Sequence, residues 1–164
     1  MKILSQRQIE QKINRLAIQI LENNFQEKEL ILAGINNNGM VFAQLLCDHL
    51  SRITTIKLRL SRIRLNPANP LDSEVEIDIP VNDLKNKAVI IVDDVANTGR
   101  TLFYATKPIM QTLPKKVEIA VLVERHHKAF PVQVDYVGLS LATTLKEDID
   151  VQLKTGEEWG VYLN

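Results

Sequence analysis

The segment from Ala88 to Leu102 constrains the fold of this chain more than any other part. It begins with five apolar residues, four of them β-branched. Such a run is typical of a strand that is buried on both faces of a parallel sheet. Asp93 and Asp94 follow directly, and a short polar turn containing Gly99 then leads into a predicted helix. Because open parallel sheets bind ligands just beyond the carboxyl ends of their strands, we expect an α/β fold with a ligand site here.

The turn after the two acids is suited to a phosphate group. Its backbone N–H groups would point out of a helix N-terminus, where the helix dipole favours an anion. Gly99 would let the backbone approach that anion closely, and Arg100 would add positive charge. The carboxylates of Asp93 and Asp94 accept hydrogen bonds only, which suits the hydroxyl groups of a ribose. The predicted phosphate-binding residues are Ala96, Asn97, Thr98, Gly99, Arg100 and Thr101.

Length and composition indicate one domain, residues 1–164, with a sizeable core, since the 164 residues are 45% hydrophobic. The formal net charge is zero, so no overall field attracts nucleic acid or a membrane surface. The single cysteine, Cys47, excludes an internal disulfide framework. No apolar run approaches the ~20 residues that a membrane-spanning helix needs. We therefore expect a cytoplasmic protein that does not enter a membrane.

Two helices and a strand are predicted before the central strand. Residues 5–8 form a capping-box pattern, and the apolar residues that follow have helical spacing to about Glu22. Residues 29–35 are a short apolar strand. Gly34 and Gly39 then enclose a turn of three asparagines before a second helix. Glycines around a strand-to-helix turn can form a nest of N–H groups, so we expect a second anion site here.

Residues 54–81 are predicted to form a β-hairpin hood, or mobile lid, over the site. Alternating residues predict two strands around a tip that is rich in asparagine and proline, and a change of parity predicts a bulge near residues 61–62. A mobile hairpin could exclude water during a reaction. Arg59, Arg62 and Arg64 could supply positive charge to the site, or could equally be solvated surface residues.

The last third of the chain contains further strand patterns. A helix is predicted over residues 102–113, with a kink or an early end at Pro108, and a buried strand over residues 117–123. The patterns at residues 149–153 and 160–163 predict a terminal hairpin that completes the sheet.

A run of four basic or titratable residues, Arg125-His126-His127-Lys128, follows the strand at residues 117–123. A histidine pair can indicate zinc, but no Cys, Asp or Glu lies at a familiar ligand spacing. The run is therefore placed near the proposed site without a metal assignment.

The central segment resembles a known signature. Residues 89–101, V-I-I-V-D-D-V-A-N-T-G-R-T, resemble the phosphoribosyl-pyrophosphate loop of type I phosphoribosyltransferases. Residues 120–141 are similar to the bacterial branch that combines uracil phosphoribosyltransferase activity with attenuation of the pyrimidine operon. The likeness extends over residues 3–153. It implies a central, mostly parallel sheet flanked by helices, with a small β-hairpin hood.

The resemblance assigns roles to individual residues. Asp93 and Asp94 would be catalytic, and Mg²⁺ would be shared by the ribose hydroxyls and the pyrophosphate, with Asp93 as a candidate ligand. Other site-lining residues would be Arg62, Arg125 and His127. Tyr136 and Val137 would bind the base, although Tyr136 could equally be an aromatic residue of the core or of a sheet edge. The pyrophosphate loop would be Ile35, Asn36, Asn37, Asn38 and Gly39. The family usually has a basic residue, Thr and Arg between the glycines, so this loop should hold pyrophosphate less tightly.

The leading hypothesis is transfer of 5-phosphoribosyl from phosphoribosyl pyrophosphate to a nucleobase. Purine-specific relatives carry Asp, and the uracil branch commonly Tyr, where this chain has Asn97, so uracil is the favoured base. The alternative is an RNA-binding regulator that senses nucleotides with little turnover. Zero net charge, and Ile18 in place of a histidine in the family's RNA-contacting helix, count against it. A phosphoacceptor receiver domain fails, because its acids begin near the first strand. By analogy with the family, we expect a homodimer.

Overall fold

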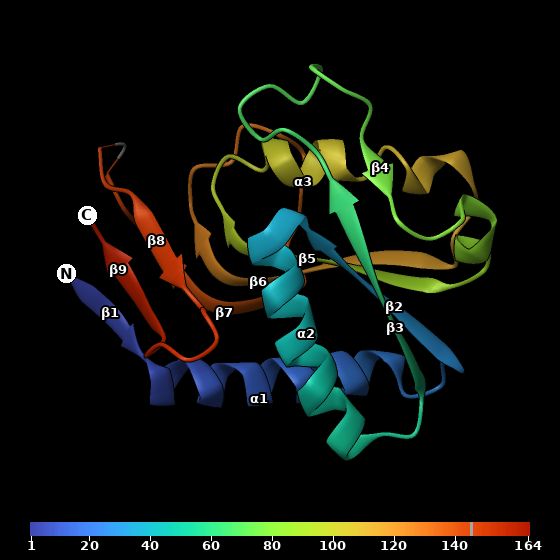
Figure 1. Cartoon of the computed structure of the whole chain (residues 1–164), viewed down its shortest axis with the longest axis horizontal. Coiled ribbons are helices and arrows are strands. Elements are labelled where there is room, and N and C mark those ends of the chain that lie inside the picture. The colour runs from blue at the N-terminus through green and yellow to red at the C-terminus, as the bar shows by residue number, and fades with distance from the viewer. Residues whose placement is uncertain (145) are drawn as a thin grey trace.

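The computed structural model describes residues 1–144 and 146–164 and is organised around a six-stranded sheet (Figure 1). The strand order is β4-β3-β2-β5-β6-β7, with only the β3–β4 pair antiparallel. The carboxyl ends of β2, β5 and β6 therefore meet at one edge, and the predicted α/β class is confirmed. The strands are β2 (Glu29–Ile35), β3 (Lys57–Arg64), β4 (Glu76–Ile77), β5 (Ala88–Ala96), β6 (Lys116–Arg125) and β7 (Tyr136–Leu141).

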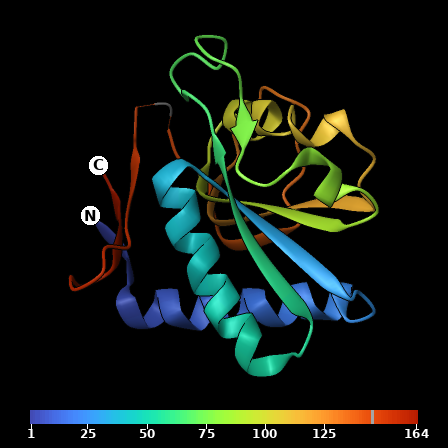
Figure 2. The ribbon, with the colours of Figure 1, turned by 45° about the vertical axis from the view of Figure 1, so that its right-hand side comes forward.

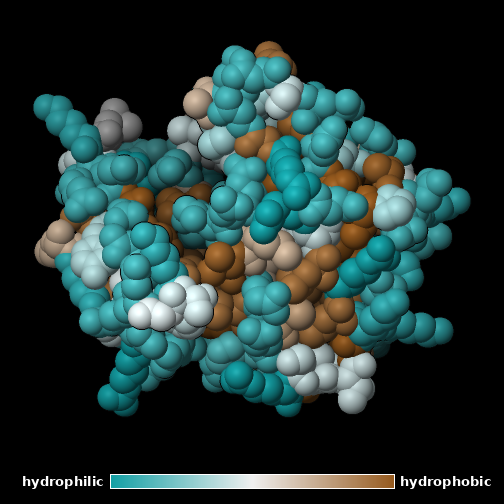
Figure 3. Space-filling model, viewed as in Figure 1, coloured by the Kyte–Doolittle hydropathy of each residue, from teal (hydrophilic) through white to brown (hydrophobic). Residues whose placement is uncertain are grey.

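Helices cover both faces of this sheet. α1 (Gln6–Asn24) and α2 (Asn36–Ile53) pack on one face, and α3 (Arg100–Ala105) on the other, with short 3₁₀ turns η1 (Val81–Leu84) and η2 (Ile109–Gln111) (Figures 1 and 2). Residues 88–92 of β5 are at most 1% exposed, as predicted for a central strand. Figure 3 shows a largely hydrophilic surface on the face that carries α2, interrupted by apolar patches. Within the described ranges, no helix combines the length and hydropathy needed to cross a membrane.

A second, three-stranded sheet joins the two ends of the chain. Its strands are β1 (Lys2–Ser5), β9 (Gly160–Leu163) and β8 (Ile149–Gln152), in the order β1-β9-β8 and all antiparallel. The terminal hairpin is confirmed, but the expectation that it completes the central sheet is wrong. The start of the chain provides the partner strand, and the new sheet packs through Leu4, Leu153 and Val161 onto the α1 side of the core.

The local signals for the first helix are confirmed. The Ser5 hydroxyl accepts a hydrogen bond from the Gln8 N–H at 3.4 Å, and the Gln8 side chain accepts one from the Ser5 N–H at 2.9 Å. The helix predicted over residues 102–113 is shorter than expected, since α3 ends at Ala105. Pro108 lacks an N–H donor and its ring would clash with the preceding turn, so the helix cannot continue through it.

No bulge interrupts β3. Its register with β2 runs without a shift from Glu29 opposite Lys57 to Ile35 opposite Ile63. The change of parity has another cause: Leu60 packs toward the α2 face, whereas Ile63 packs into the cluster on the α3 face. The buried face of the strand therefore changes along its length. The turn-rich tip between β3 and β4 extends beyond the sheet (Figure 2).

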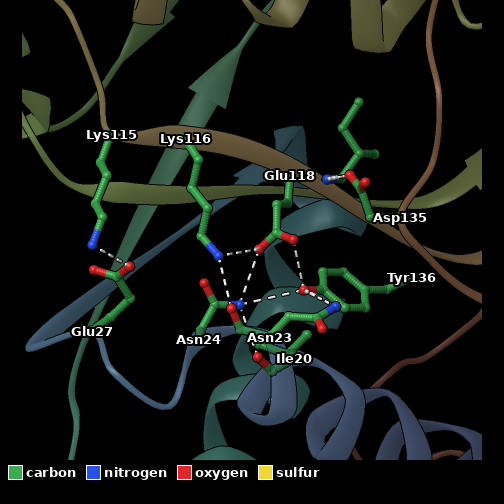
Figure 4. Close-up of polar contacts among 10 residues, drawn as sticks. Ile20, Asn23, Asn24, Glu27, Lys115, Lys116, Glu118, Asp135 and Tyr136 are labelled. Atoms are coloured by element: carbon green, nitrogen blue, oxygen red, sulfur yellow. Dashed lines mark hydrogen bonds and ion pairs between the residues drawn. The ribbon is translucent and has the colours of Figure 1, made fainter.

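A buried polar cluster fastens the end of α1 to the amino ends of β6 and β7 (Figure 4). The Tyr136 hydroxyl donates to the Glu118 carboxylate at 2.8 Å and accepts from the side-chain amides of Asn23 at 3.2 Å and Asn24 at 3.3 Å. Lys116 lies 3.6 Å from the same carboxylate. Burial raises the pKa of the Tyr136 hydroxyl. Because Tyr136 is only 1% exposed, the cluster belongs to the core.

Removing the Tyr136 hydroxyl should destabilise the fold. Tyr136→Phe leaves the half-buried Glu118 carboxylate and two amides short of a partner, which typically costs about 1–3 kcal/mol. The measurement is the free energy of unfolding in urea. Tyr104→Phe is the control, because that half-buried ring packs among other aromatic rings on α3 and should change stability by less than about 0.5 kcal/mol. Equal stability of Tyr136→Phe and the unaltered protein would contradict the assigned role.

Candidate active site

The two acids and both predicted loops open into one cleft at the carboxyl edge of the sheet. The turn at residues 95–102 also encloses a smaller cavity of about 40 Å³. Segments that are far apart in the sequence therefore line one cleft. The main cleft has a volume of about 400 Å³ and is lined by Ile35, Asn36, Asn37, Asn38, Pro67, Asp93, Asp94, Val95, Asn97, Thr101 and Ile149.

The first turn of α2 lies unusually close to the ends of β2 and β5. A Cβ atom on Gly39 would lie 2.6 Å from the Val92 carbonyl oxygen, and one on Gly34 would lie 2.5 Å from the Met40 Cα. These contacts are with backbone, which cannot move aside easily. The two glycines thus permit close packing of the helix, and Asn36, at φ 51°, makes the sharp turn between strand and helix.

The two acids differ in their environments. Asp93 is 8% exposed and accepts a hydrogen bond from the Asp94 N–H at 2.9 Å. Asp94 is half-buried and accepts one from the Val95 N–H at 2.9 Å. Burial, reinforced by the neighbouring Asp94 carboxylate, raises the pKa of Asp93 well above its usual value. A ligand can therefore reach Asp94 more fully than Asp93. Asp93 lies beneath it and holds its backbone N–H in a hydrogen bond.

The turn predicted to bind phosphate is held in a defined shape. Gly99 adopts a left-handed conformation with φ 85° directly before α3. The Thr98 side chain accepts from the Arg100 N–H at 3.3 Å, and its carbonyl accepts from the Ala129 N–H at 2.9 Å. The Arg100 guanidinium donates to the Pro67 carbonyl at 2.7 Å. The arginine therefore reaches across to the β3–β4 connection.

The β3–β4 connection is fastened to the asparagine loop as well. The Asn36 side chain donates to the Leu65 carbonyl at 2.9 Å and accepts from the Leu65 N–H at 3.1 Å. This pair of hydrogen bonds reproduces the pattern by which one strand would bind another. Asn36 is therefore engaged with the connection through both polar atoms of its side chain.

The three arginines of β3 have separate surroundings. Arg59 forms an ion pair with Asp83 at 2.9 Å, and Arg64 forms one with Asp78. Arg62 lines two clefts of about 520 Å³ and 460 Å³ that lie beside α2. Its Nε is buried and has no hydrogen-bond partner within the described residues.

Arg125 and His127 do not line the main cleft. Their side chains instead contact segments beside it. The Arg125 guanidinium, in a residue 9% exposed, donates to the Thr143 hydroxyl at 2.7 Å, the Thr144 carbonyl at 2.8 Å and the Asn97 side chain at 3.3 Å. A ring nitrogen of His127 contacts the Thr143 carbonyl at 2.5 Å. These residues link the phosphate turn to the segment that leads to β8.

Tyr136, which the resemblance assigns to base binding, lies away from the main cleft. The residue lies at the amino end of β7, opposite Ala120 of β6, whereas the cleft lies at the carboxyl edge. Its hydroxyl is bound within the core cluster described above. Val137 packs against the apolar cluster on the α3 face. Neither side chain faces the cleft. The sequence motif that contains them forms strand β7 of the sheet.

A second cleft beside Asp94 was not predicted from the sequence. It has a volume of about 540 Å³ and adjoins β8, the edge strand of the small sheet. The alternation of residues predicted the strand at residues 149–153 but not its position. The position of β8 beside α2 depends on the pairing of the two chain ends. Its lining residues are Asn38, Val41, Asp94, Asp150, Val151, Gln152, Leu153, Lys154 and Thr155.

Comparison with known families identifies the family to which this chain belongs. Residues 1–153 match the family model described as phosphoribosyl transferase domain. The chain belongs to the phosphoribosyltransferase family. The resemblance inferred from residues 89–101 is thereby confirmed, together with the expected fold.

Individual relatives agree with this assignment. The phosphoribosyltransferase chain is 32% identical to the bifunctional protein PyrR of Clostridium acetobutylicum, over 96% of this chain and 92% of that protein. It is 32% identical to the pyrimidine operon regulatory protein of Lactococcus lactis, over 93% and 89%. A solved hypoxanthine-guanine phosphoribosyltransferase from Bacillus anthracis superposes with a TM-score of 0.72 at 22% identity, covering 86% of this chain and 82% of that one. That structure shows the shared fold.

Replacing Asp93 by asparagine should stabilise this phosphoribosyltransferase at pH 7. The pKa of Asp93 is raised on folding, so the folded protein loses stability as the pH rises from about 4 toward that pKa. Each pH unit of the difference is worth about 1.4 kcal/mol. Asp93→Asn removes this loss, and its carbonyl can still accept from the Asp94 N–H.

The measurement is the melting temperature of Asp93→Asn and the unaltered protein between pH 4 and pH 8. The gain should shrink as the pH falls toward 4. Glu157→Gln, at an exposed position, serves as the control and should show no such trend. A variant that is less stable than the unaltered protein at pH 7 would show that burial of the Asp93 charge is not a cost.

Proposed function

We propose that the chain transfers the 5-phosphoribosyl group of phosphoribosyl pyrophosphate to uracil, releasing pyrophosphate. The observation that carries this proposal is the convergence of Asp93, Asp94 and the two strand-to-helix turns on one cleft. The ribose would lie over the acids, with its 5-phosphate in the turn at residues 97–101. The pyrophosphate would lie at the loop of residues 35–39. The small cavity within residues 95–102 supports the placement of the phosphate.

In the proposed reaction, the bond between C1′ of the ribose and the pyrophosphate oxygen breaks as the base nitrogen approaches. Positive charge develops on the ribose, and the carboxylate of Asp94 would stabilise it. Asp93, whose pKa burial raises, would fix the position of Asp94 by accepting a hydrogen bond from the Asp94 N–H. Holding both reactants in line can contribute about 7–11 kcal/mol to catalysis.

The base would bind in the cleft of about 540 Å³ beside β8. Among the strands of residues 1–144 and 146–164, β8 pairs with β9 alone, so the other side of its backbone can donate to and accept from a ring with amide character. Asn97 provides no carboxylate to act as a base on a purine nitrogen. The name of the Lactococcus lactis relative, which refers to the pyrimidine operon, also favours a pyrimidine.

Mg²⁺ is the proposed cofactor. The described residues include no cluster of three or more His, Cys, Asp or Glu side chains that could hold a metal alone. Mg²⁺ is usually held by one or two carboxylates together with substrate phosphates, and Asp94 and Asp150 line the same cleft. The residues therefore fit an ion that arrives with the substrate, with Asp94 as its nearest protein ligand. Bound there, the ion would neutralise charge on the leaving pyrophosphate.

We further propose that residues 1–164 act as one domain, with the hairpin at residues 54–81 as a lid. Pro67 lines the main cleft, and both Asn36 and Arg100 hydrogen-bond to the connection between β3 and β4. The working unit is proposed to be a homodimer. Its support is the exposure of apolar side chains, such as Met110 at 69% and Leu113 at 75%, which are typical of association surfaces. Light scattering measures the oligomeric state.

RNA-binding regulation is the second candidate, because one relative is named a bifunctional protein and another a pyrimidine operon regulatory protein. The outward face of α1 presents Lys12, Asn14 and Arg15, but also Ile18, which is 42% exposed. A regulator requires saturable, sequence-selective RNA binding at physiological salt, since phosphate contacts dominate such affinity. Nucleotide binding without turnover would favour this function over catalysis.

The test of the enzyme is incubation with phosphoribosyl pyrophosphate, Mg²⁺ and a panel of bases, with detection of nucleotide and pyrophosphate. We expect product with uracil alone. Asp94→Asn should lower kcat at least ~100-fold, because it removes charge that stabilises the transition state, while Tm stays nearly constant. Glu157→Gln, which removes a carboxylate at an exposed position that lines none of these clefts, controls for a general effect of altered charge. Full activity of Asp94→Asn would refute the proposed role of that acid.

A further inference from the structure

The loop proposed to hold pyrophosphate has no positive charge of its own. Residues 36–39 are three asparagines and a glycine, and none of the side chains that line the 400 Å³ cleft is basic. Two carboxylates, those of Asp93 and Asp94, lie in the same cleft. The N-terminus of α2 contributes only about half a unit of charge. A strongly charged anion at this loop needs a cation from another part of the chain.

The arginines of β3 do not meet this need well. Arg59 and Arg64 are engaged in ion pairs with Asp83 and Asp78. Arg62 lines two clefts that include Asn37, but Asp94 lines neither of them. Arg62 therefore lines clefts that adjoin those of the site, but it does not line a cleft together with Asp94.

Lys154 is in a better position. It lines the 540 Å³ cleft together with Asn38, the last asparagine of the loop, and Asp94. Among the described residues, no other basic side chain lines either of the two clefts that contain Asp94. Within residues 1–144 and 146–164, Lys154 forms no ion pair, and its side chain is exposed.

The backbone places Lys154 at the start of the turn between β8 and β9. The Glu157 N–H donates to the Lys154 carbonyl at 3.3 Å, and Gly156 adopts φ 85°, which closes the turn. Figure 1 shows β8 as the strand of the small sheet on the side of α2. The pairing of the chain ends thus brings a lysine to the first turn of α2.

We propose that Lys154 binds the pyrophosphate group of the substrate, in place of the cations that the asparagine loop lacks. This inference rests on the proposed function. A lysine ammonium is an effective point charge for phosphate, and its long side chain can follow the anion as the bond breaks. The 5-phosphate, bound at residues 97–101 on the other side of Asp94, would not depend on it.

The experiment measures binding by calorimetry with two probes, inorganic pyrophosphate and ribose 5-phosphate, both with Mg²⁺. Lys154→Gln should weaken pyrophosphate binding about 10- to 100-fold, the effect of one lost charge-assisted contact. It should change ribose 5-phosphate binding less than about twofold. Lys154→Arg, which keeps the charge, should retain most of the pyrophosphate affinity. Lys107→Gln, at an exposed position on the opposite face, is the matched control.

The outcomes separate this inference from the proposed function. If the unaltered protein binds neither probe, the proposed function and the inference both fail. If it binds both probes and Lys154→Gln binds pyrophosphate equally well, the inference alone is overturned. If Arg62→Gln loses affinity for pyrophosphate and Lys154→Gln does not, Arg62 supplies the charge and the inference about Lys154 is overturned. Equal losses in Lys154→Gln and Lys154→Arg would show that the charge is not the cause.

Discussion

The close approach of the first turn of α2 to the end of β5 is the constraint on which the site depends. It is possible only because Gly39 has no Cβ to collide with the Val92 carbonyl. The contact brings the asparagine loop beside the acid pair, and the turn that follows β5 completes the cleft. A larger residue at position 39 would push the helix away and separate the parts of the site, whatever their chemistry. The packing of one glycine therefore determines whether the two loops can hold one substrate.

The same close packing buries Asp93, and this has an energetic consequence. A carboxyl group removed from water beside a second carboxylate favours its neutral form, so its pKa rises and its ionisation opposes folding. A chain selected for stability alone would have no reason to keep an acid here. A stability cost of this kind, confined to one residue at a cleft, is typical of functional sites.

The small sheet supplies the other half of the site. It forms only because β9 pairs with the first residues of the chain, and this pairing places β8 and the following turn beside Asp94. Arg125 joins this region to the phosphate turn through hydrogen bonds to Asn97 and to the segment before β8. The proposed base and phosphate subsites are thus mechanically connected. The proposed pyrophosphate-binding lysine also belongs to this part of the structure.

By itself, the sequence determined the local elements: the capped first helix, the doubly buried central strand, the adjoining acids and the glycine-containing turns. Each of these depends on neighbouring residues, through hydrogen-bond capping, burial patterns or backbone conformation. Only the tertiary structure decided that Tyr136 serves the core, that β3 has no bulge, and that residues 149–155 line the cleft. Those outcomes depend on contacts between segments far apart in the chain. The pattern of residue types along a strand shows that one of its faces is buried, but not which distant segment covers it.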